Sequence, residues 1–392
     1  MQSFRVPRQP PSSKFKVQGS KSRRTATARS IIPRSAFRVP RSLVPALLAW
    51  FATAARDLPW RRTLDPYAIW VSEIMLQQTQ VKTVIPYWER WLRDLPTIAA
   101  LAHAAPERIL KLWEGLGYYS RARNLQKAAQ KIVAESGGRF PDEFAAVLAL
   151  PGIGRYTAGA ICSIAFNRPF PILDGNVIRL LTRLFGIRAD PHSKATNAHL
   201  WQLAEQLVLE AASLPPAGHC SHLNQALMEL GALICTPRQP RCDLCPVRKS
   251  CVARRDNLTD QLPQLRARPP ITQQRFIAFV VEKRGRFLVR QRPTDAVNGG
   301  LWEFPNLKID REPVEIPVLV HNFLGADEFS GEPLCTIKHS ITRYRIQLEA
   351  HHVELPPDGK FPRGRWLKPA DLLQLAFASA HRKILQRLLT HH

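Results

Sequence analysis

The sequence predicts a mainly α N-terminal domain followed by a separate α+β domain. Three observations predict this division. Between residues 43 and 260 apolar residues recur at helical spacing, with Gly or Pro between the segments. Residues 254–275 are polar and contain three prolines, which is typical of a linker. From residue 276 the apolar pattern changes to a period of two, as in strands.

A basic tail is expected over residues 1–41, which contain eleven Lys or Arg and no acidic residue. This composition is typical of a disordered, solvated arm. It also fits an organelle transit peptide or an arm that grips DNA, and the sequence leaves the three open. The chain is expected inside the cell, in the cytoplasm or nucleoid of a bacterium. A targeting role for the tail would place it in a nucleus or mitochondrion.

The helical domain is expected over residues 42–253. Its longest pattern, 67–93, contains Pro86, which is expected to break the helix. Further helices are expected over 106–114, 120–135, 141–149, 155–166, 174–186, 197–212 and 220–234.

Within this domain, residues 150–161 read LPGIGRYTAGAI and predict a helix–hairpin–helix. Gly152 and Gly154 permit a tight turn with positive φ. The bare amides and the start of the next helix favour a phosphate. A plain helix connector is the ordinary alternative, but the acid-free helix that follows favours a DNA phosphate.

Two carboxylates stand out by position. Glu73 lies inside an apolar helical run, and Asp174 lies at a helix N-cap with Asn176 two residues later. Each has an ordinary explanation, a hydrogen-bonded buried acid and a plain cap. Together with a DNA-binding hairpin they suggest acid chemistry on a glycosidic bond.

Four of the seven cysteines, Cys235, Cys242, Cys245 and Cys251, crowd into seventeen residues. The clustered, odd count argues against a secreted disulfide framework and for a metal site. Zinc would tolerate the spacing, but unequal arms of six, two and five residues suit one 4Fe-4S cluster better.

The C-terminal domain is expected over residues 276–390, after the linker 254–275. Segments 276–282 and 287–291 flank a KRGR turn and predict a hairpin. Residues 343–350 alternate as a further strand, and an amphipathic helix is expected over 371–389.

The net charge of +25 points to a polyanion, most often nucleic acid and less often an anionic membrane surface. The tail supplies eleven of these charges, so the remaining chain still carries +14 (25 − 11). No stretch approaches the roughly 18 apolar residues of a membrane span, and no membrane partner is expected.

The motifs SEIMLQQTQV, EGLGYYSRARNL, LPGIGRYTAGAI and LDGNVIRL, with the four-cysteine loop, resemble the endonuclease III superfamily of DNA glycosylases. Within it the chain resembles the MutY-type adenine glycosylases over roughly residues 42–390. The resemblance implies a helix-hairpin-helix glycosylase domain and a Nudix-like C-terminal domain. It also implies removal of adenine mispaired with 8-oxoguanine or guanine in double-stranded DNA.

The resemblance further implies a role for each matching residue. Glu73 would protonate adenine N7, Asp174 would stabilise the cationic sugar, and Asn176 and Tyr156 would position them. Related glycosylase-lyases carry an amine nucleophile, lysine, at the place of Tyr156, so this chain is expected to be monofunctional. MutY-type enzymes often carry a lysine where this chain has Ile178.

The DNA contacts are implied in the same way. Gln78 and Tyr118 would wedge into the duplex from which the base is extruded. In the C-terminal domain the Phe-Ser-His reading loop of the family aligns with residues 337–339, and only His339 is retained. The residues after NGGLWEFPN lack the paired glutamates of a Nudix hydrolase, so recognition without hydrolysis is expected.

The prediction is therefore a monomeric adenine DNA glycosylase with an iron–sulfur cluster. One alternative is another glycosylase of the same fold, acting on oxidised pyrimidines or mismatched thymine. The others are a nucleotide pyrophosphohydrolase, through the C-terminal domain, and a non-catalytic DNA sensor. The sensor is excluded only if Glu73 and Asp174 converge in one pocket.

Overall fold

The computed structural model describes residues 39–215, 218–266, 269–310, 315–324, 332–355 and 364–391. Chain contacts divide the protein into Met1–Arg38 and Val39–His392, and only the second unit is described here. Of the predicted tail 1–41, all but residues 39–41 lie outside the described residues. No helix of the described ranges is both long and apolar enough to cross a membrane.

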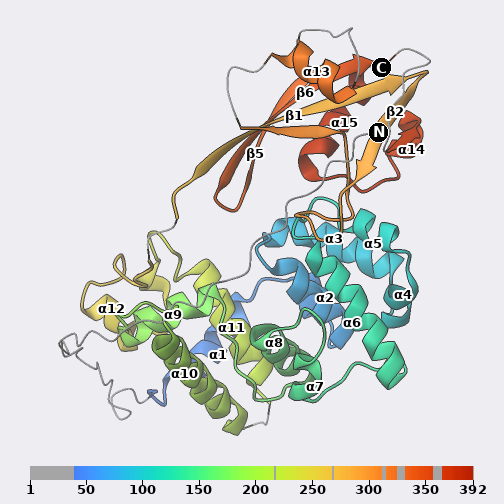
Figure 1. Cartoon of the computed structure of the whole chain (residues 1–392). Coiled ribbons are helices and arrows are strands. Elements are labelled where there is room, and N and C mark those ends of the chain that lie inside the picture. The colour runs from blue at the N-terminus through green and yellow to red at the C-terminus, as the bar shows by residue number, and fades with distance from the viewer. Residues whose placement is uncertain are drawn as a thin grey trace, which may run out of the picture. The chain divides into compact units, whose positions relative to one another are not determined.

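The N-terminal part of this unit is helical, as predicted (Figure 1). Its α helices are α1 (Leu43–Ala54), α2 (Pro66–Leu76), α3 (Val81–Asp94), α4 (Ile98–His103), α5 (Pro106–Leu112), α6 (Ser120–Ser136), α7 (Phe144–Leu148), α8 (Arg155–Phe166), α9 (Gly175–Phe185), α10 (Lys194–Ser213), α11 (Cys220–Leu233) and α12 (Val252–Arg255). Short 3₁₀ turns are η1 (Pro59–Arg61), η2 (Cys242–Leu244) and η3 (Arg248–Ser250).

Helix α2 is the centre of this domain. Asp65 caps it by accepting a hydrogen bond from Tyr67 N at 3.0 Å, and Pro66 occupies its first position. Every residue from Tyr67 to Met75 is buried. A helix that is buried on all sides leaves no exposed face for its polar residues, so Glu73 is buried with the rest.

The expectation that Pro86 breaks the 67–93 segment was wrong. Pro86 lies inside α3, and the break falls at residues 77–80 between α2 and α3. Gln78 has a φ of 57°, and a left-handed residue cannot continue a right-handed helix. The interruption is therefore set by the backbone of Gln77, with a ψ of 111°, and of Gln78, before α3 begins at Val81.

The predicted hairpin joins α7 to α8. Gly152 has a φ of 78°, and a Cβ there would lie 2.6 Å from Asn124 Cβ, so glycine is required. The same expectation for Gly154 was wrong, since this residue is the extended N-cap of α8, with φ −100° and ψ 177°.

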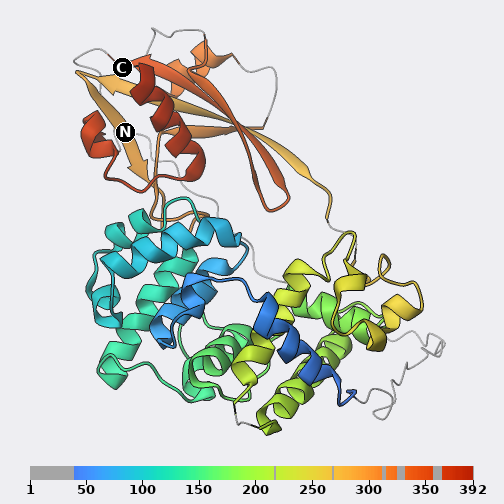
Figure 2. The same ribbon diagram turned by 180° about the vertical axis from the view of Figure 1, so that it is seen from behind.

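The C-terminal part is built on a mixed sheet, seen from both sides in Figure 1 and Figure 2. Its strands are β1 (Thr272–Lys283), β2 (Arg286–Gln291), β3 (Trp302–Glu303), β4 (Asn306–Ile309), β5 (Cys335–Ile341), β6 (Tyr344–Glu354) and β7 (Arg365–Leu367). Its helices are α13 (Ile316–Leu324), α14 (Pro369–Leu372) and α15 (Ser379–His391). The strand order is β3-β2-β1-β6-β5, with β4 also paired to β1 and β7 to β2.

The predicted hairpin at the KRGR turn is confirmed. Lys283 pairs with Arg286 across a two-residue turn in which Arg284 and Gly285 both have positive φ, the geometry of a type I′ turn. Strand β1 runs parallel to β6 in the middle of the sheet. Both of its faces are covered, one by α14 and α15 and the other by α13, so residues 277–281 are all buried.

The single helix expected over 371–389 was wrong, because the segment forms α14 and α15 with an extended stretch between them. In that stretch Trp302 N donates to Ala376 O at 2.8 Å, and Ala378 N donates to Trp302 O at 3.1 Å. These sheet-like bonds replace the hydrogen bonds that a continuous helix would have made.

Gly159 is expected to be essential for docking α8 beside the strand-like segment that leads to Asp174. A Cβ at Gly159 would lie 2.2 Å from Pro171 O, which is backbone and cannot turn aside. Gly159→Ala is expected to lower the free energy of unfolding by about 1–3 kcal/mol, measured by chemical denaturation.

The matched control is Gly154→Ala, because Gly154 has negative φ and no heavy atom within 4 Å of its Cβ position. Equal stability of the two variants would contradict the packing argument.

Candidate active site

Glu73 lies on α2 with only 5% of its surface exposed. Its Oε2 accepts a hydrogen bond from the Tyr156 hydroxyl on α8 at 2.9 Å. Burial raises the pKa of Glu73 from 4.5 to about 7, although the Tyr156 hydrogen bond opposes this shift. The nearby Asp174 charge also raises the pKa. Glu73 can therefore hold a proton near neutral pH.

Asp174 lies at the N-cap of α9, as predicted. Its Oδ1 accepts from Val177 N at 2.7 Å, and its Oδ2 accepts from Asn176 Nδ2 at 3.0 Å. Burial raises the pKa of Asp174, while these hydrogen bonds oppose that shift. The two carboxylates thus differ in their hydrogen-bond donors. Glu73 accepts from one phenol hydroxyl, whereas Asp174 accepts from two N–H groups.

Both carboxylates line one cavity of about 570 Å³, together with Tyr156, Asn176 and Gln78. The cavity has walls from α2, α8, α9 and α11. The two side chains therefore flank one space large enough for a purine nucleoside. Two carboxyl groups with different hydrogen-bond donors on one space are an arrangement suited to glycosidic cleavage.

Tyr156 is bound on both sides within the cavity. Its hydroxyl donates to Glu73 and lies 3.2 Å from Met228 Sδ. Burial, with the charges of Glu73 and Asp174, raises the pKa of Tyr156 well above 10, so the phenol stays neutral. No lysine of the described residues lines the cavity.

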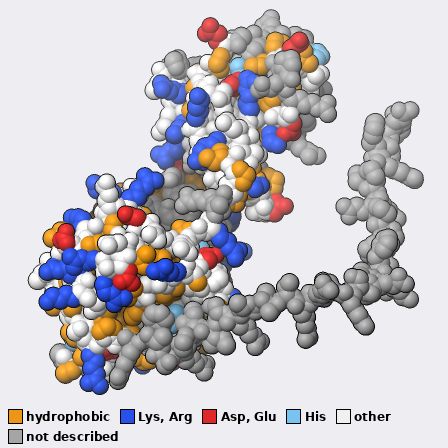
Figure 3. Space-filling view, turned by 90° about the vertical axis from the view of Figure 1, so that its left-hand side faces the viewer, with side chains coloured by type: hydrophobic (Ala, Val, Ile, Leu, Met, Phe, Trp, Pro, Cys, Tyr) orange, Lys and Arg blue, Asp and Glu red, His pale blue; other side chains and the backbone are white. Residues whose placement is uncertain are grey.

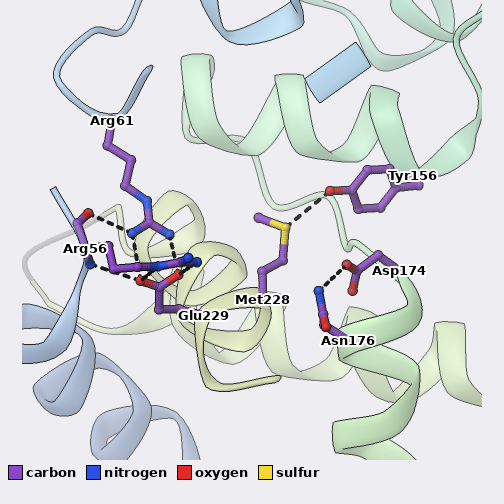
Figure 4. A network of polar contacts seen from close by, with 7 residues as sticks. All are labelled: Arg56, Arg61, Tyr156, Asp174, Asn176, Met228 and Glu229. Carbon is purple, nitrogen blue, oxygen red and sulfur yellow. Dashed lines mark hydrogen bonds and ion pairs between the residues drawn. The ribbon is translucent and has the colours of Figure 1, made fainter. Parts of the chain in front are cut away.

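The sequence did not point to a third acid that lines the same cavity, Glu229 on α11. Figure 4 shows Arg56 and Arg61 converging on its carboxylate. Arg56 Nη2 lies 2.6 Å and Arg61 Nη2 3.0 Å from Glu229 Oε2. Burial alone would raise the pKa of Glu229, but these hydrogen bonds outweigh it and lower the pKa to about 2. Glu229 is therefore a fixed anion beside the proton-holding Glu73.

Asn176, which holds Asp174, is itself held by Arg179 one turn along α9. Arg179 Nη2 donates to Asn176 Oδ1 at 2.8 Å and to Gly231 O at 2.6 Å, and Nε donates to Cys235 O at 2.7 Å. The position of Asp174 thus depends on α11 and on the start of the cysteine loop.

The four predicted cysteines border one small pocket beside α9, with Arg183 and Arg254. Arg183 Nη1 lies 3.4 Å from Cys235 Sγ. Burial raises the pKa of Cys245 to about 11, and the three other cysteines add to the shift because they are close. No group of three or more His, Cys, Asp or Glu side chains stands close enough to hold a single metal ion within the described ranges.

The predicted DNA-contacting residues of this domain are exposed. Gly152 and Gly154 lie on the surface at the start of α8, and no side chain of the described residues caps that helix end. Its first amides therefore face outward and can meet a phosphate. Gln78 is exposed, and Tyr118 exposes 48% of its surface, which is unusual for an aromatic residue.

His339 lies on β5, at the edge of the described sheet order. It is half-buried on the same strand face as Cys335 and Ile337, while Lys338 is exposed on the other face. Burial lowers the pKa of His339, and the Lys383 charge on α15 lowers it further. The acid of the NGGLWEFPN motif, Glu303, is buried and paired with Arg290 and Arg292.

Basic side chains are spread over the helical domain. In the face shown in Figure 3, Lys and Arg outnumber Asp and Glu over the described surface. A surface of this kind attracts a polyanion without depending on one contact.

The proton affinity of Glu73 should be visible as a pH-dependent stability. Between about pH 4.5 and 7 the folded chain keeps a proton on Glu73 that the unfolded chain releases, so the free energy of unfolding falls as pH rises through this window. Glu73→Gln is neutral at every pH. Above pH 7 it is expected to exceed the wild type in stability by on the order of 3 kcal/mol.

The measurement is chemical denaturation of both proteins at pH 5 and at pH 8, with the exposed Glu107→Gln as control. A stability difference between Glu73→Gln and wild type that does not change between the two pH values would contradict the assignment.

Comparisons with known proteins identify the family. Residues 71–206 match the family model of the HhH-GPD superfamily base excision DNA repair proteins, and residues 277–387 match that of the NUDIX domain. The adenine DNA glycosylase of Rattus norvegicus is 35% identical over 401 residues, covering 87% of this chain and 76% of the rat protein. The Homo sapiens adenine DNA glycosylase is 35% identical over 404 residues, covering 87% of this chain and 73% of its own length.

A solved structure of a thermostable thymine-DNA glycosylase is 32% identical, covering 55% of this chain and 97% of its own, at a TM-score of 0.49. The long matches to the mammalian proteins extend across both domains. The chain therefore belongs to the adenine DNA glycosylase family, with a helical HhH-GPD domain and a C-terminal NUDIX domain.

Proposed function

We propose that this chain excises adenine mispaired with 8-oxoguanine or guanine from double-stranded DNA, as a monofunctional glycosylase of base excision repair. The observation that carries the proposal is the shared cavity, in which a buried Glu73 with a pKa of about 7 faces a capped Asp174. The family supports adenine as the base.

Glu73 acts as the general acid in this proposal. Adenine is a poor leaving group until it is protonated, and a donor must be protonated at the working pH. The pKa of about 7 satisfies this requirement. Tyr156 donates to Glu73 Oε2 and so leaves Oε1 to carry the proton toward N7 of the extruded adenine.

Asp174 stabilises the positive charge that develops on the sugar. Its hydrogen bonds from Val177 N and Asn176 Nδ2 favour the ionised form against the effect of burial. Asn176 and Tyr156 act as positioning residues, one for each carboxylate. Because no amine lines the cavity in the described part of the chain, the product is an abasic site with the strand intact.

The choice of the mispair is assigned to exposed residues that take no part in the acid chemistry. Gln78 and Tyr118, both exposed, enter the duplex where adenine leaves it. Gly152 and Gly154 present the backbone of the hairpin to a phosphate. The C-terminal domain reads 8-oxoguanine on the opposite strand, with His339 as the base contact or, instead, with Lys338 contacting a phosphate.

One 4Fe-4S cluster is proposed on Cys235, Cys242, Cys245 and Cys251. Their convergence on one pocket supports it, and a single zinc ion would need thiolates at about 2.3 Å from one point. When bound, the cluster would cross-link the loop that follows α11, since base removal itself transfers no electron. Arg183, which lies beside Cys235 Sγ, would donate to a ligand thiolate.

The full chain is proposed to divide into a basic tail 1–41, a glycosylase domain 42–253, a linker 254–275 and a Nudix-like domain 276–390. The protein is proposed to act as a monomer inside the cell, where its DNA substrate lies.

The activity is tested with three duplexes, carrying A opposite 8-oxoguanine, A opposite guanine, and thymine glycol, each assayed with and without alkali. Strand breaks are expected only after alkali and only on the first two duplexes. Breaks on the thymine glycol duplex, or breaks without alkali, would count against a monofunctional adenine glycosylase.

Replacing Glu73 by Gln is expected to lower the single-turnover excision rate at least about 100-fold while DNA binding persists. The wild-type rate is expected to fall about tenfold per pH unit above about pH 7, because Glu73 then loses its proton. Glu107→Gln, on the exposed face of α5, serves as the control. Near-normal cleavage by Glu73→Gln would refute the role of this acid.

The cluster is tested by metal content. The purified chain is expected to contain about four iron atoms and a visible absorption band, and Cys242→Ser is expected to reduce both. Cys335→Ser, a half-buried cysteine on β5, is the matched control and should retain the iron. Zinc in place of iron in the wild type would overturn the assignment.

A further inference from the structure

Arg121 lies between two loops that the proposed function places on DNA. It is the second residue of α6 and is half-buried. One loop comprises residues 77–80 between α2 and α3, and the other comprises residues 115–119 before α6. Neither the excision chemistry nor the hairpin accounts for the contacts of this side chain.

One arm of the guanidinium holds the end of α2. Arg121 Nη1 donates to Ile74 O at 2.8 Å, to Met75 O at 3.1 Å and to Gln77 O at 2.6 Å. The last carbonyls of a helix have no partner within it and carry partial negative charge. Burial lowers the pKa of Arg121 to about 10, which still leaves it positively charged at neutral pH.

The other arm holds the second loop. Arg121 Nη2 donates to Leu116 O at 3.0 Å and to Gly117 O at 3.1 Å, and it also reaches Thr79 Oγ1 at 3.5 Å. The guanidinium carbon lies 5.8 Å from the centre of the Tyr118 ring. One planar fork therefore bonds the backbones of both loops, which a lysine ammonium could not do in the same geometry.

The residues that follow two of these carbonyls share an unusual backbone. Gln78, after Gln77, has a φ of 57°, and Tyr118, after Gly117, has a φ of 47°. Side chains other than glycine rarely adopt this region and stay there only when the surroundings enforce it. Both side chains are exposed, so the enforcement comes from the backbone contacts and not from side-chain burial.

We propose that Arg121 is a positioning residue that fixes Gln78 and Tyr118 relative to each other, and so sets how strongly the enzyme prefers 8-oxoguanine to guanine opposite adenine. The inference rests on the proposed function, in which these two side chains enter the duplex. If Gln78 and Tyr118 are already held in place, they can enter the base stack without the entropic cost of first ordering their two loops.

The test compares single-turnover excision rates, with enzyme in excess, on three duplexes: A opposite 8-oxoguanine, A opposite guanine, and A opposite an abasic-site analogue. The last contains an unpaired adenine, which costs less to extrude. Arg121→Lys is expected to lower the ratio of the first two rates roughly tenfold, since misplacement by about 1 Å can cost about 100-fold. Its rate on the unpaired adenine should stay within about twofold of wild type.

A double variant separates positioning from a general structural role. If Arg121 acts through Tyr118, Arg121→Lys combined with Tyr118→Ala should lower the ratio no further than Tyr118→Ala alone. Arg139→Lys, the same exchange at an exposed arginine after α6, should leave all three rates unchanged. Equal slowing on all three duplexes by Arg121→Lys, or effects that multiply in the double variant, would overturn the proposal.

Thermal unfolding confirms that each variant is folded at the assay temperature. If Arg121→Lys is not, Gly117→Ala replaces it, because alanine disfavours the φ of 70° and would displace the Gly117 carbonyl from Nη2. That variant is expected to lower the same ratio, and an unchanged ratio would also overturn the proposal. A wild type that excises no adenine from any duplex would instead refute the proposed function.

Discussion

The hydrogen bond between Tyr156 and a desolvated Glu73 is the interaction on which the site depends. Glu73 belongs to a helix whose residues 67–75 are all buried, so its proton affinity is set by the packing of the hydrophobic core. Any change that admits water to α2 would return the acid toward its ordinary pKa. Asp174, by contrast, obtains its N–H donors from the start of α9. One core thus places two carboxyl groups with different hydrogen-bond donors at one cavity.

The features that were predicted correctly from the sequence are those that depend on residues close together in the chain. Helix α8 was predicted with the bounds observed, and the two-residue hairpin turn was recognised, because capping, spacing and turn chemistry are local. The acid Glu73 stood out because a carboxylate in an apolar helix is rare. Glu229 gave no comparable signal, since its meaning lies in Arg56 and Arg61, far away in the chain. The division of 371–389 into two helices was not predicted for the same reason, because the competing backbone hydrogen bonds come from Trp302, which is distant in the sequence.

The net charge of the chain does not indicate which basic residues are free to contact DNA. Several arginines direct their donors inward: Arg56 and Arg61 to Glu229, Arg121 to loop carbonyls, and Arg179 to Asn176. These side chains count toward the charge of the whole chain, yet they hold the site together. Arginine suits this work, because its planar fork can bind several oxygens at once and stays charged when half-buried. A lysine at such a position would supply the charge without the geometry.

The parallel pairing of β1 with β6 has a consequence for how the protein is synthesised. Thr272 pairs with Tyr344, so the central contact of the C-terminal sheet forms only after a long intervening segment has emerged and closed into a loop. The helical domain precedes this sheet in the chain, so all of its helices have emerged before β6 is made. During translation the glycosylase core can therefore assemble first, and until β6 arrives β1 presents an open apolar edge that is prone to association with other chains.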